Sequence, residues 1–402
     1  YTEAEIEVVT VAMTAINSHV VLPIARECAR HEPDLFIIYL GNNEVVGPFG
    51  PGTVLSRLPR QSSAVQMRIA LSSTRIGQLF ELLGGWVAAS PEMPVTQQAS
   101  LLFLDNLVPW GDPGLDSVYA HFAENLKGIR DAGLAGGAKV ILCNVASNLR
   151  DCPPFAPQHR PGLSKADDEQ WERIYAEGKA SESAGNLARA IERYAAAAEI
   201  DDRHADLQFR LARAYWSRGE SEQARELYIA ARDLDCLRFR ADSRINQIIR
   251  SVAEEKPGSD VRFADVVAAV ADRSPQQVPG AEFFYEHVHF TFQGNHLLAR
   301  TVLEQLEAAL PERFPRAHGT RDVLTVEQSA KLLAHTEWDH RRIIGNVLKA
   351  YVGSPPFVGQ IYHEEGVKRL GDQFRKLHLS TLPRGLEDAV EQYRNAIPRY
   401  PS

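Results

Sequence analysis

The sequence predicts an α/β protein that is interrupted by an all-α segment and followed by a helical C-terminal region. Short apolar runs alternate with helical patterns in the first third of the chain, which is typical of βαβ units. A strand-free helical stretch with an internal repeat comes next. The α/β pattern then returns and gives way to further helices. These changes divide the chain into two parts of one α/β domain, 1–165 and 257–318, a helical insertion, 166–256, and a helical region, 319–402.

Three short runs in the first third are candidate strands. Residues 6–11 form a β-branched run, and residues 35–40 and 139–145 form mostly apolar runs bounded by glycine. Helices are expected between them, at 20–31 and 117–132. Continuous apolar strands are typical of parallel sheets that helices cover on both faces. We therefore predict a parallel sheet in which residues 35–40 are buried on both sides.

The helical insertion repeats itself with a period of 34 residues. Four residues return at the same offset: Gly185, Ala190, Tyr194 and Ala197 recur as Gly219, Ala224, Tyr228 and Ala231. The period and the small-aromatic-small spacing resemble the tetratricopeptide repeat; an unrelated pair of helical hairpins is the alternative. Two repeats are fewer than the three or so that are usually stable alone. We expect them to lean on a neighbouring domain or on a capping helix at 244–255.

The remaining elements follow the insertion. Residues 260–264 are a candidate strand, and a helix is expected to begin near Gly294. Apolar residues recur every fourth position on that helix, at Leu298, Val302 and Leu306. The chain is helical in pattern from Thr320 onward. Four residues there fit the second helix of one more tetratricopeptide unit: Ala389, Tyr393, Ala396 and Pro401.

Composition argues against several classes of protein. The 402 residues carry 44 Lys and Arg against 52 Asp and Glu, a formal net charge of −8, so no nucleic-acid partner is expected. No apolar run approaches the ~18–20 residues needed to span a bilayer. The four cysteines form no Cys-x-x-Cys pair, so neither a metal nor another cofactor is predicted.

The first residues suggest that the chain is a piece of a longer protein. They include no initiator methionine and no signal-peptide pattern. A signal or anchor would belong to the missing segment, so the sequence leaves the compartment open. It leaves the oligomeric state open as well.

Two short constellations carry chemistry. The first is Gly41-Asn42-Asn43-Glu44, directly after the predicted buried strand. Ligands of open α/β sheets bind at the carboxyl ends of the strands, where an asparagine amide can stabilise an oxyanion. The second is Glu286-His287-Val288-His289, in which an acid three residues before a histidine can orient the imidazole.

At these residues the chain resembles the SGNH, or GDSL-type, hydrolases. That family has a flavodoxin-like three-layer fold and a Ser-His-Asp triad, and it hydrolyses or transfers acyl groups. The resemblance makes His289 the general base and Glu286 its orienting acid. It places Gly41, Asn43 and Ala15 at the oxyanion hole. Asn43 is the side-chain donor of the block that begins at Gly41, and Ala15 is closest to the position of a second, backbone donor. The longer matching runs resemble a bacterial subgroup that joins this fold to tetratricopeptide repeats.

The sequence departs from the family pattern in two ways. Glutamate replaces aspartate in both matching blocks, at Glu44 and Glu286. The family's nucleophilic serine follows strand one, and no such motif precedes Thr10, so the nucleophile is absent from this chain. In the flavodoxin-like order 2-1-3-4-5, strand one would lie between residues 6–11 and 35–40. We therefore expect ~45–60 further residues upstream, which would carry strand one and the serine.

Structural alternatives exist for each principal residue. Asn43 can cap the turn after its strand, and His289 can be a hydrogen-bonded structural histidine. His287 and His289 alternate in an extended chain and so point to one side, but no third zinc ligand is apparent. We interpret His287 as structural.

Four further features have weaker interpretations. Glu44 and Asn148 are candidates to line the substrate pocket at the carboxyl ends of the strands. For Asn148, a solvated turn is the alternative. Residues 47–52 are rich in glycine but lack the Lys-Ser/Thr of a phosphate loop. The apolar helix at 69–86 is a lid or, with better support, plain core. Ser18 neighbours His19, but adjacent residues rarely form a nucleophile–base pair.

These motifs and repeats are compatible with two functions. The first is an ester hydrolase or O-acyl transferase of SGNH type that acts on an acyl ester substrate through a Ser-His-Glu triad. The second is a degenerate scaffold whose tetratricopeptide groove binds a peptide or protein partner. A mixed function, in which the repeats recruit a partner for the enzyme, is also open.

Overall fold

The computed structural model describes residues 6–53, 103–256, 260–309 and 323–396. These residues fall into two compact units. The sheet unit comprises residues 11–146 and 154–267, and the C-terminal unit comprises residues 6–10, 147–153 and 268–402. The helix predicted at 69–86 lies outside the described residues. Within the described ranges, no helix has the length and apolar character to cross a membrane.

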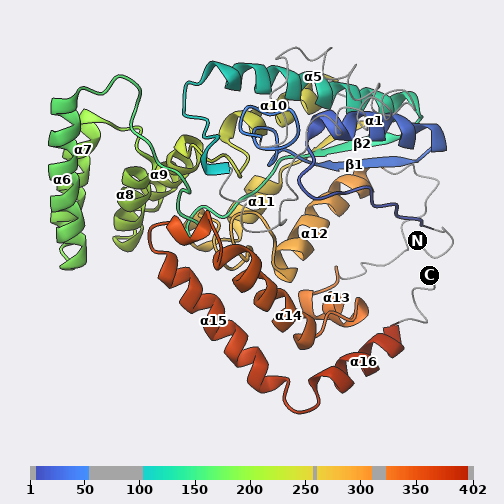
Figure 1. Ribbon diagram of the computed structural model, residues 1–402. Coiled ribbons are helices and arrows are strands. Elements are labelled where there is room, and N and C mark those ends of the chain that lie inside the picture. The colour runs from blue at the N-terminus through green and yellow to red at the C-terminus, as the bar shows by residue number, and fades with distance from the viewer. Residues whose placement is uncertain (1–5, 54–102, 257–259, 310–322, 397–402) are drawn as a thin grey trace, which may run out of the picture. The chain divides into compact units, whose positions relative to one another are not determined.

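The sheet unit is built on three parallel strands in the order β1-β2-β3. They are β1 (Leu35–Tyr39), β2 (Lys139–Cys143) and β3 (Val261–Ala264). The register sets Leu35 opposite Lys139 and Val140 opposite Val261. Three helices pack their apolar faces on this sheet (Figure 1): α1 (Ser18–Cys28), α5 (Pro113–Ala135) and α10 (Ser243–Glu254).

Local chemistry sets the limits of these elements. The side chain of Asp112 accepts a hydrogen bond of 2.6 Å from the Gly114 amide and caps α5, whose first residue is a proline. Phe122, Leu126 and Ile129, at most 1% exposed, form the buried stripe of that helix. The strands predicted at 139–145 and 260–264 are confirmed as β2 and β3. The helices predicted at 20–31 and 117–132 are confirmed as α1 and α5.

Two predictions about the first strands are wrong. Residues 6–11 form neither strand nor helix, and Val8 is 81% exposed. A β-branched run becomes a strand only where a partner supplies hydrogen bonds and packing, and none of the described strands pairs with it. The run at 35–40 does form β1, but Ile37 is 53% exposed. Among the described strands β1 lies at an edge of the sheet, and the face that carries Ile37 is open to solvent.

The repeat segment forms two antiparallel helix pairs, each packed side by side (Figure 1). They are α6 (Lys165–Ser183) with α7 (Leu187–Ile200), and α8 (Ala205–Ser217) with α9 (Ser221–Leu234). The repeated alanines and tyrosines are at most 1% exposed. A Cβ atom on Gly178 would lie 2.5 Å from the Tyr194 ring, so this position requires the absence of a side chain. The small and aromatic residues that repeat every 34 positions therefore lie in the interior of the helix pairs.

The helix expected to cap the repeats belongs to the sheet instead. α10 lies where a helix was predicted, but Ile245, Ile249 and Val252 pack in the same core as Phe122 and Leu142. The predicted capping role is therefore wrong for this helix, because its apolar face packs against the sheet and α5 and not against the repeats.

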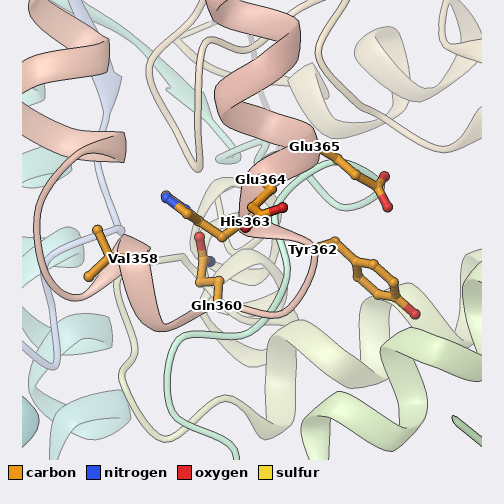
Figure 2. Close-up of a pocket in the computed structure, with 6 residues that line it drawn as sticks. All are labelled: Val358, Gln360, Tyr362, His363, Glu364 and Glu365. Carbon is orange, nitrogen blue, oxygen red and sulfur yellow. The ribbon is translucent and has the colours of Figure 1, made fainter.

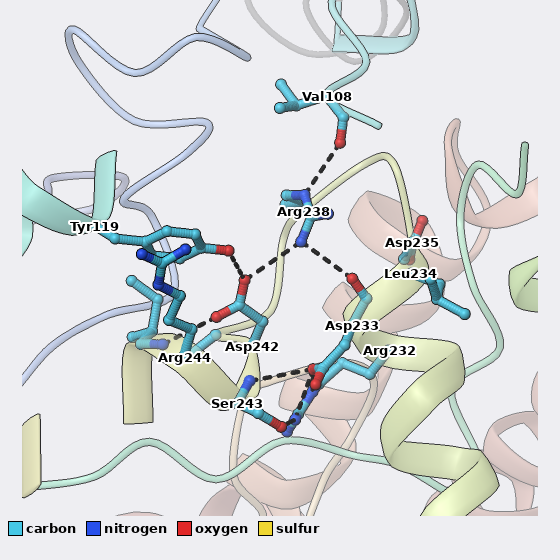
Figure 3. Close-up of polar contacts among 12 residues, drawn as sticks. Val108, Tyr119, Arg232, Asp233, Leu234, Asp235, Arg238, Asp242, Ser243 and Arg244 are labelled. Carbon is cyan, nitrogen blue, oxygen red and sulfur yellow. Dashed lines mark hydrogen bonds and ion pairs between the residues drawn. The ribbon is translucent and has the colours of Figure 1, made fainter. Parts of the chain in front are cut away.

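The repeats lean on the sheet helices through a buried polar junction between α9 and α10 (Figure 3). Arg238 donates to the carbonyls of Val108 at 3.0 Å and Asp233 at 3.1 Å, and to the Asp242 carboxylate at 3.3 Å. The Tyr119 hydroxyl donates to the same carboxylate. The junction therefore ties the end of the repeat segment to α5 by charge and hydrogen bonds.

The C-terminal unit is helical. Its helices are α12 (Phe292–Ala309), α13 (Val326–Leu332), α14 (Glu337–Val347), α15 (His363–Ser380) and α16 (Gly385–Ala396), and α11 (Val266–Asp272) precedes them. α14 begins with a reciprocal cap between Thr336 and Asp339. The helix predicted near Gly294 and the helical region after 319 are confirmed. Whether α16, with Ala389 buried, begins another repeat stays a prediction. The described chain is thus a mixed, mostly helical protein with a small parallel sheet.

Candidate functional site

The acid–histidine segment is the tip of a closed loop in the C-terminal unit. The Tyr285 amide donates to the His289 carbonyl at 2.9 Å, and the Thr291 amide donates to the Phe283 carbonyl at 2.8 Å. The rings of Phe284 and Phe290 stack across the loop with centroids 4.7 Å apart. The backbone comes close enough to α12 that a Cβ on Gly294 would lie 2.4 Å from the Phe283 oxygen. The tip is therefore held by backbone and ring contacts before any chemistry is considered.

Asn148 holds this tip from behind. Its Nδ2 donates to the Glu286 carbonyl at 2.7 Å, and its own amide donates to the His287 carbonyl at 2.9 Å. Its Oδ1 accepts from the Asp151 amide at 2.9 Å. Asn148 is 0% exposed, so the solvated-turn interpretation is wrong. A side chain so engaged supports the loop, whereas its predicted role in lining a pocket stays a prediction.

The Glu286 carboxylate is the centre of the loop. It is 4% exposed and accepts hydrogen bonds from the backbone amides of His287, Val288 and His289. It also pairs with Nδ1 of both His287 and His289. A carboxylate that accepts this many bonds is fixed in position, and it in turn fixes which nitrogen of each imidazole carries the proton. The spacing of an acid three residues before a histidine thus produces the contact that the sequence predicts.

The pKa values of the pair follow from this geometry. Burial alone would raise the pKa of Glu286, but the charge of His287 and the hydrogen bonds from both histidines outweigh it and hold that pKa well below its usual range. The hydrogen bond to Glu286 raises the pKa of His289 above its ordinary value, against a smaller effect of burial. The pair is therefore built to stabilise an imidazolium at His289.

His289 is the member of the pair that faces solvent. Its side chain is 55% exposed, whereas those of His287 and Glu286 are 10% and 2% exposed. Nδ1 is engaged with Glu286, and no described residue forms a hydrogen bond with Nε2. An imidazole held at one nitrogen and open at the other can accept and return a proton.

The same three side chains lie close enough together to raise the question of a metal site. Atoms of Glu286, His287 and His289 lie within 4.8 Å of one another. However, both carboxylate oxygens already accept hydrogen bonds from the two Nδ1 atoms. Only Nε2 atoms would remain for an ion, and zinc sites in proteins use three or four ligands. The arrangement fits an acid–histidine pair better than a metal centre.

The other predicted residues lie in the sheet unit, beyond the end of β1. Gly41 adopts φ +154°, and a Cβ there would lie 2.9 Å from Ile245. Nδ2 of Asn43 donates to the Ile16 carbonyl at 3.1 Å, and the Asn43 carbonyl accepts from the Gly47 amide at 2.7 Å. Asn43 thus shapes its turn, as the capping alternative states. Its amide carries two N–H bonds, so the donor role stays open as a prediction.

Ala15 and Glu44 flank the start of α1. Ala15 is exposed and has φ +60°, a left-handed conformation that is uncommon outside glycine and often marks a functional turn. Glu44 is 4% exposed and accepts from the Ser18 amide at 2.9 Å and from its hydroxyl at 2.7 Å. It therefore caps the helix, a structural role that the sequence pattern around Glu44 does not indicate.

Ser18 and His19 form a buried polar cluster with Asn125. Nδ2 of Asn125 donates to the Ser18 hydroxyl at 3.0 Å and lies 3.1 Å from Nδ1 of His19. Burial, aided by the charge of His121, lowers the pKa of His19 to about 4. Because Ser18 is 0% exposed and bonded to Glu44, it is unsuited to attack a substrate.

A separate hollow lies at the start of α15 (Figure 2). Its lining residues are Val358, Gln360, Tyr362, His363, Glu364 and Glu365. Figure 2 shows the side chains of Tyr362 and Glu365 directed away from the His363 ring. Acidic residues in a first helical turn are expected for helix stability alone. None of the predicted site residues lines this hollow.

Comparison with known proteins identifies one segment. A model of the tetratricopeptide repeat family matches residues 183–235, which span α7, α8 and α9. No curated protein and no solved structure matches the chain. The hydrolase resemblance is therefore still a prediction. The 34-residue period, by contrast, is confirmed as that of a tetratricopeptide repeat.

Proposed function

We propose that this protein is an ester hydrolase or acyl transferase of SGNH type, with a flavodoxin-like sheet interrupted by tetratricopeptide repeats. The observation that carries the proposal is the Glu286–His289 pair, a buried carboxylate bound to Nδ1 of a solvent-facing imidazole. This is the base end of a serine–histidine–acid triad. The expected substrate is an acyl ester.

Each side chain has a role in the proposed reaction. Nε2 of His289 takes the proton of a serine hydroxyl as the oxygen attacks the ester carbonyl, and later gives that proton to the leaving alcohol. Glu286 stabilises the imidazolium that forms in between. Water then repeats the sequence on the acyl-enzyme and releases the acid. Asn148 holds the loop that carries this pair.

The sheet supports the fold part of the proposal. The order β1-β2-β3, all parallel, is compatible with strands three, four and five of the order 2-1-3-4-5. Gly41 and Asn43 follow the carboxyl end of β1, the edge at which such sheets bind ligands. Asn43 and the backbone amide of Ala15 are the proposed oxyanion donors. In this scheme residues 1–165 and 257–318 together form one α/β domain, and the repeats at 166–256 are inserted between these two parts.

The test uses the protein as its gene encodes it. A fluorophosphonate probe, which reacts with activated serines, is expected to label one serine, and p-nitrophenyl acetate is expected to be hydrolysed. Replacement His289→Ala should lower turnover by about 10²–10⁴-fold and abolish labelling. His296→Ala, at a partly exposed histidine of the same unit whose Nε2 lies 2.9 Å from the Leu324 carbonyl oxygen, is the control. Absence of both labelling and hydrolysis in the unaltered protein would refute the proposal.

Asn43→Ala tests the oxyanion donor separately. Removal of one such donor typically costs ~2.7–4 kcal/mol of barrier, or about 100–1000-fold in kcat. The loss should appear in kcat and leave KM nearly constant, since the donor acts on the transition state. Unchanged turnover would remove Asn43 from the mechanism.

A second candidate function is protein binding through the repeats. The family match at 183–235 favours it, because tetratricopeptide repeats suggest protein partners. Peptides selected by display against the intact protein should then lose affinity when Lys179, whose Nζ lies 4.6 Å above the Tyr175 ring, is changed to glutamate. Selected peptides whose affinity does not respond to any change in α6–α9 would argue against binding at the repeats.

A further inference from the structure

His289 and His287 belong to a closed set of four aromatic rings in the C-terminal unit. The His289 centroid lies 5.2 Å from that of Tyr351, and the His287 centroid lies 5.4 Å from that of Phe357. Tyr351 and Phe357 are 6.2 Å apart, and the two imidazoles are 5.8 Å apart. Each ring therefore touches two others, at tilted or edge-on angles that aromatic pairs favour.

The two non-histidine rings come from one short segment after α14. Tyr351 lies in the π-helical turn Leu348–Val352, which directly continues α14. π-Helical turns are rare and often mark functional sites, because the extra residue redirects a side chain. The turn ends with the Gly353 amide donating to the Leu348 carbonyl at 2.8 Å. The segment therefore places Tyr351 by a special backbone geometry.

The segment is anchored in a core. Val352 and Phe357 are 7% and 6% exposed, and Val352 packs with Tyr285, Ile344 and Leu370. Tyr285 belongs to the same closed loop as Glu286 and His289. The loop that carries His289 and the turn that carries Tyr351 thus pack on one apolar cluster, and this packing sets the distance between the two rings.

We infer that Tyr351 is a positioning residue for His289, an inference that rests on the proposed function of His289 as the general base. Among the described residues His289 has one side-chain hydrogen bond, at Nδ1, and its side chain is 55% exposed. A single bond leaves the ring plane free to rotate about it. The Tyr351 ring blocks that rotation on one side and leaves Nε2 open.

The side chain offers a matched pair of variants. Tyr351→Phe keeps the ring and its contact with His289, whereas Tyr351→Ala removes both. Tyr362→Ala, at a partly exposed tyrosine of the same unit that is not one of the four rings, controls for a general loss of aromatic surface. The Tyr351 hydroxyl has no part in the inference, so the phenylalanine variant should behave as the unaltered protein does.

The first readout does not depend on catalysis. The Nδ1 proton of an imidazole bound to a carboxylate gives a downfield signal in proton NMR, and its loss in His289→Gln assigns it. That signal is expected to be sharp in the unaltered protein, in Tyr351→Phe and in Tyr362→Ala, and broadened or lost in Tyr351→Ala. An unchanged, sharp signal in Tyr351→Ala would overturn the inference.

The second readout is ester hydrolysis by the same proteins. A misplaced base should lower kcat by about ten- to a hundredfold in Tyr351→Ala and leave KM nearly constant, with recovery in Tyr351→Phe. Full activity in Tyr351→Ala would overturn the inference. If the NMR pattern appears as expected but no form hydrolyses esters, the positioning role stands and the proposed function falls.

Discussion

The side chain of Asn148 donates a hydrogen bond of 2.7 Å to the carbonyl of Glu286, a residue 138 positions later in the chain. This contact joins the segment after β2 to the loop that carries the acid–histidine pair. Neither partner is exposed by more than 4%. The loop that presents His289 to solvent is therefore held by a buried amide.

Asn148→Ala should destabilise the protein and lower its activity. The change leaves the Glu286 carbonyl and the Asp151 amide without this partner, at about 1–3 kcal/mol for each buried group left unpaired. Chemical denaturation measures the loss. Asn295→Ala, at an exposed side chain with longer bonds of 3.2 and 3.4 Å, should stay within ~0.5 kcal/mol. Equal effects of the two changes would contradict the supporting role of Asn148.

The Glu286–His289 pair predicts a window of pH in which it stabilises the fold. Because the pKa of Glu286 is lowered, this residue stabilises the folded state at pH values above its ordinary pKa of 4.5. That contribution is lost as the pH falls through the lowered pKa. Because the pKa of His289 is raised, this residue contributes its full stabilisation at pH values below its ordinary pKa of 6.5. That contribution is lost as the pH rises through the raised pKa. Both contributions are present together between about pH 4.5 and 6.5.

Glu286→Gln makes this window visible. The difference in Tm between the unaltered protein and this variant should be largest inside the window and should shrink on both sides. A scan of Tm against pH for the two proteins in the same buffers gives the answer. A difference that does not vary with pH would mean that the pair is not charged in the folded protein.

The junction beside α9 should be a sensitive point of the sheet unit (Figure 3). The side chains of Arg238 and Asp242 are 4% and 8% exposed, and loss of one partner leaves a buried charge, which costs ~3–5 kcal/mol. We expect a loss of that size for Arg238→Met in chemical denaturation. Asp242→Asn should cost less, since it keeps the bond from the Ile245 amide that caps α10.

A neighbouring ion pair supplies the control for this prediction. Arg244 and Asp116 are joined at 2.9 Å, but their side chains are 56% and 77% exposed. Exposed pairs contribute ~0–1 kcal/mol, so Asp116→Ala should change stability very little. If Arg238→Met were as mild as Asp116→Ala, the repeats would not depend on this junction.

Local patterns predicted much of the fold. The 34-residue repeat, β2, β3 and the capped helix α5 are all encoded within short windows of sequence. The strand expected at 6–11 does not form. A strand exists only with a partner, and none of the described strands pairs with this run. The capping role expected of α10 failed for a related reason. Its periodicity reveals an apolar face but not the core to which that face belongs.

The candidate site, like the fold, was predictable from the sequence only where its contacts are local. The spacing of Glu286 and His289 is local, and the expected contact between them is present. Asn148 was picked out by its place after a strand, but its bond to Glu286 spans 138 residues and no local pattern encodes it. Tyr351 was missed, because its place depends on a π-helical turn that has no clear sequence signal.

Glu44 predicts a dependence of stability on pH that is opposite to that of a paired carboxylate. Burial raises its pKa to about 7, and the hydrogen bonds from Ser18 only partly oppose this. The folded state then holds a proton that the unfolded state releases near its ordinary pKa of 4.5, so stability falls as pH rises from about 4.5 to about 7. Glu44→Gln has no proton to lose, so its stability relative to the unaltered protein should rise across that range. Glu27→Gln, which removes a carboxylate that is 62% exposed, is the surface control measured over the same range. A relative stability of Glu44→Gln that stays constant from acid to neutral pH would mean that the Glu44 carboxyl is ionised in the folded protein.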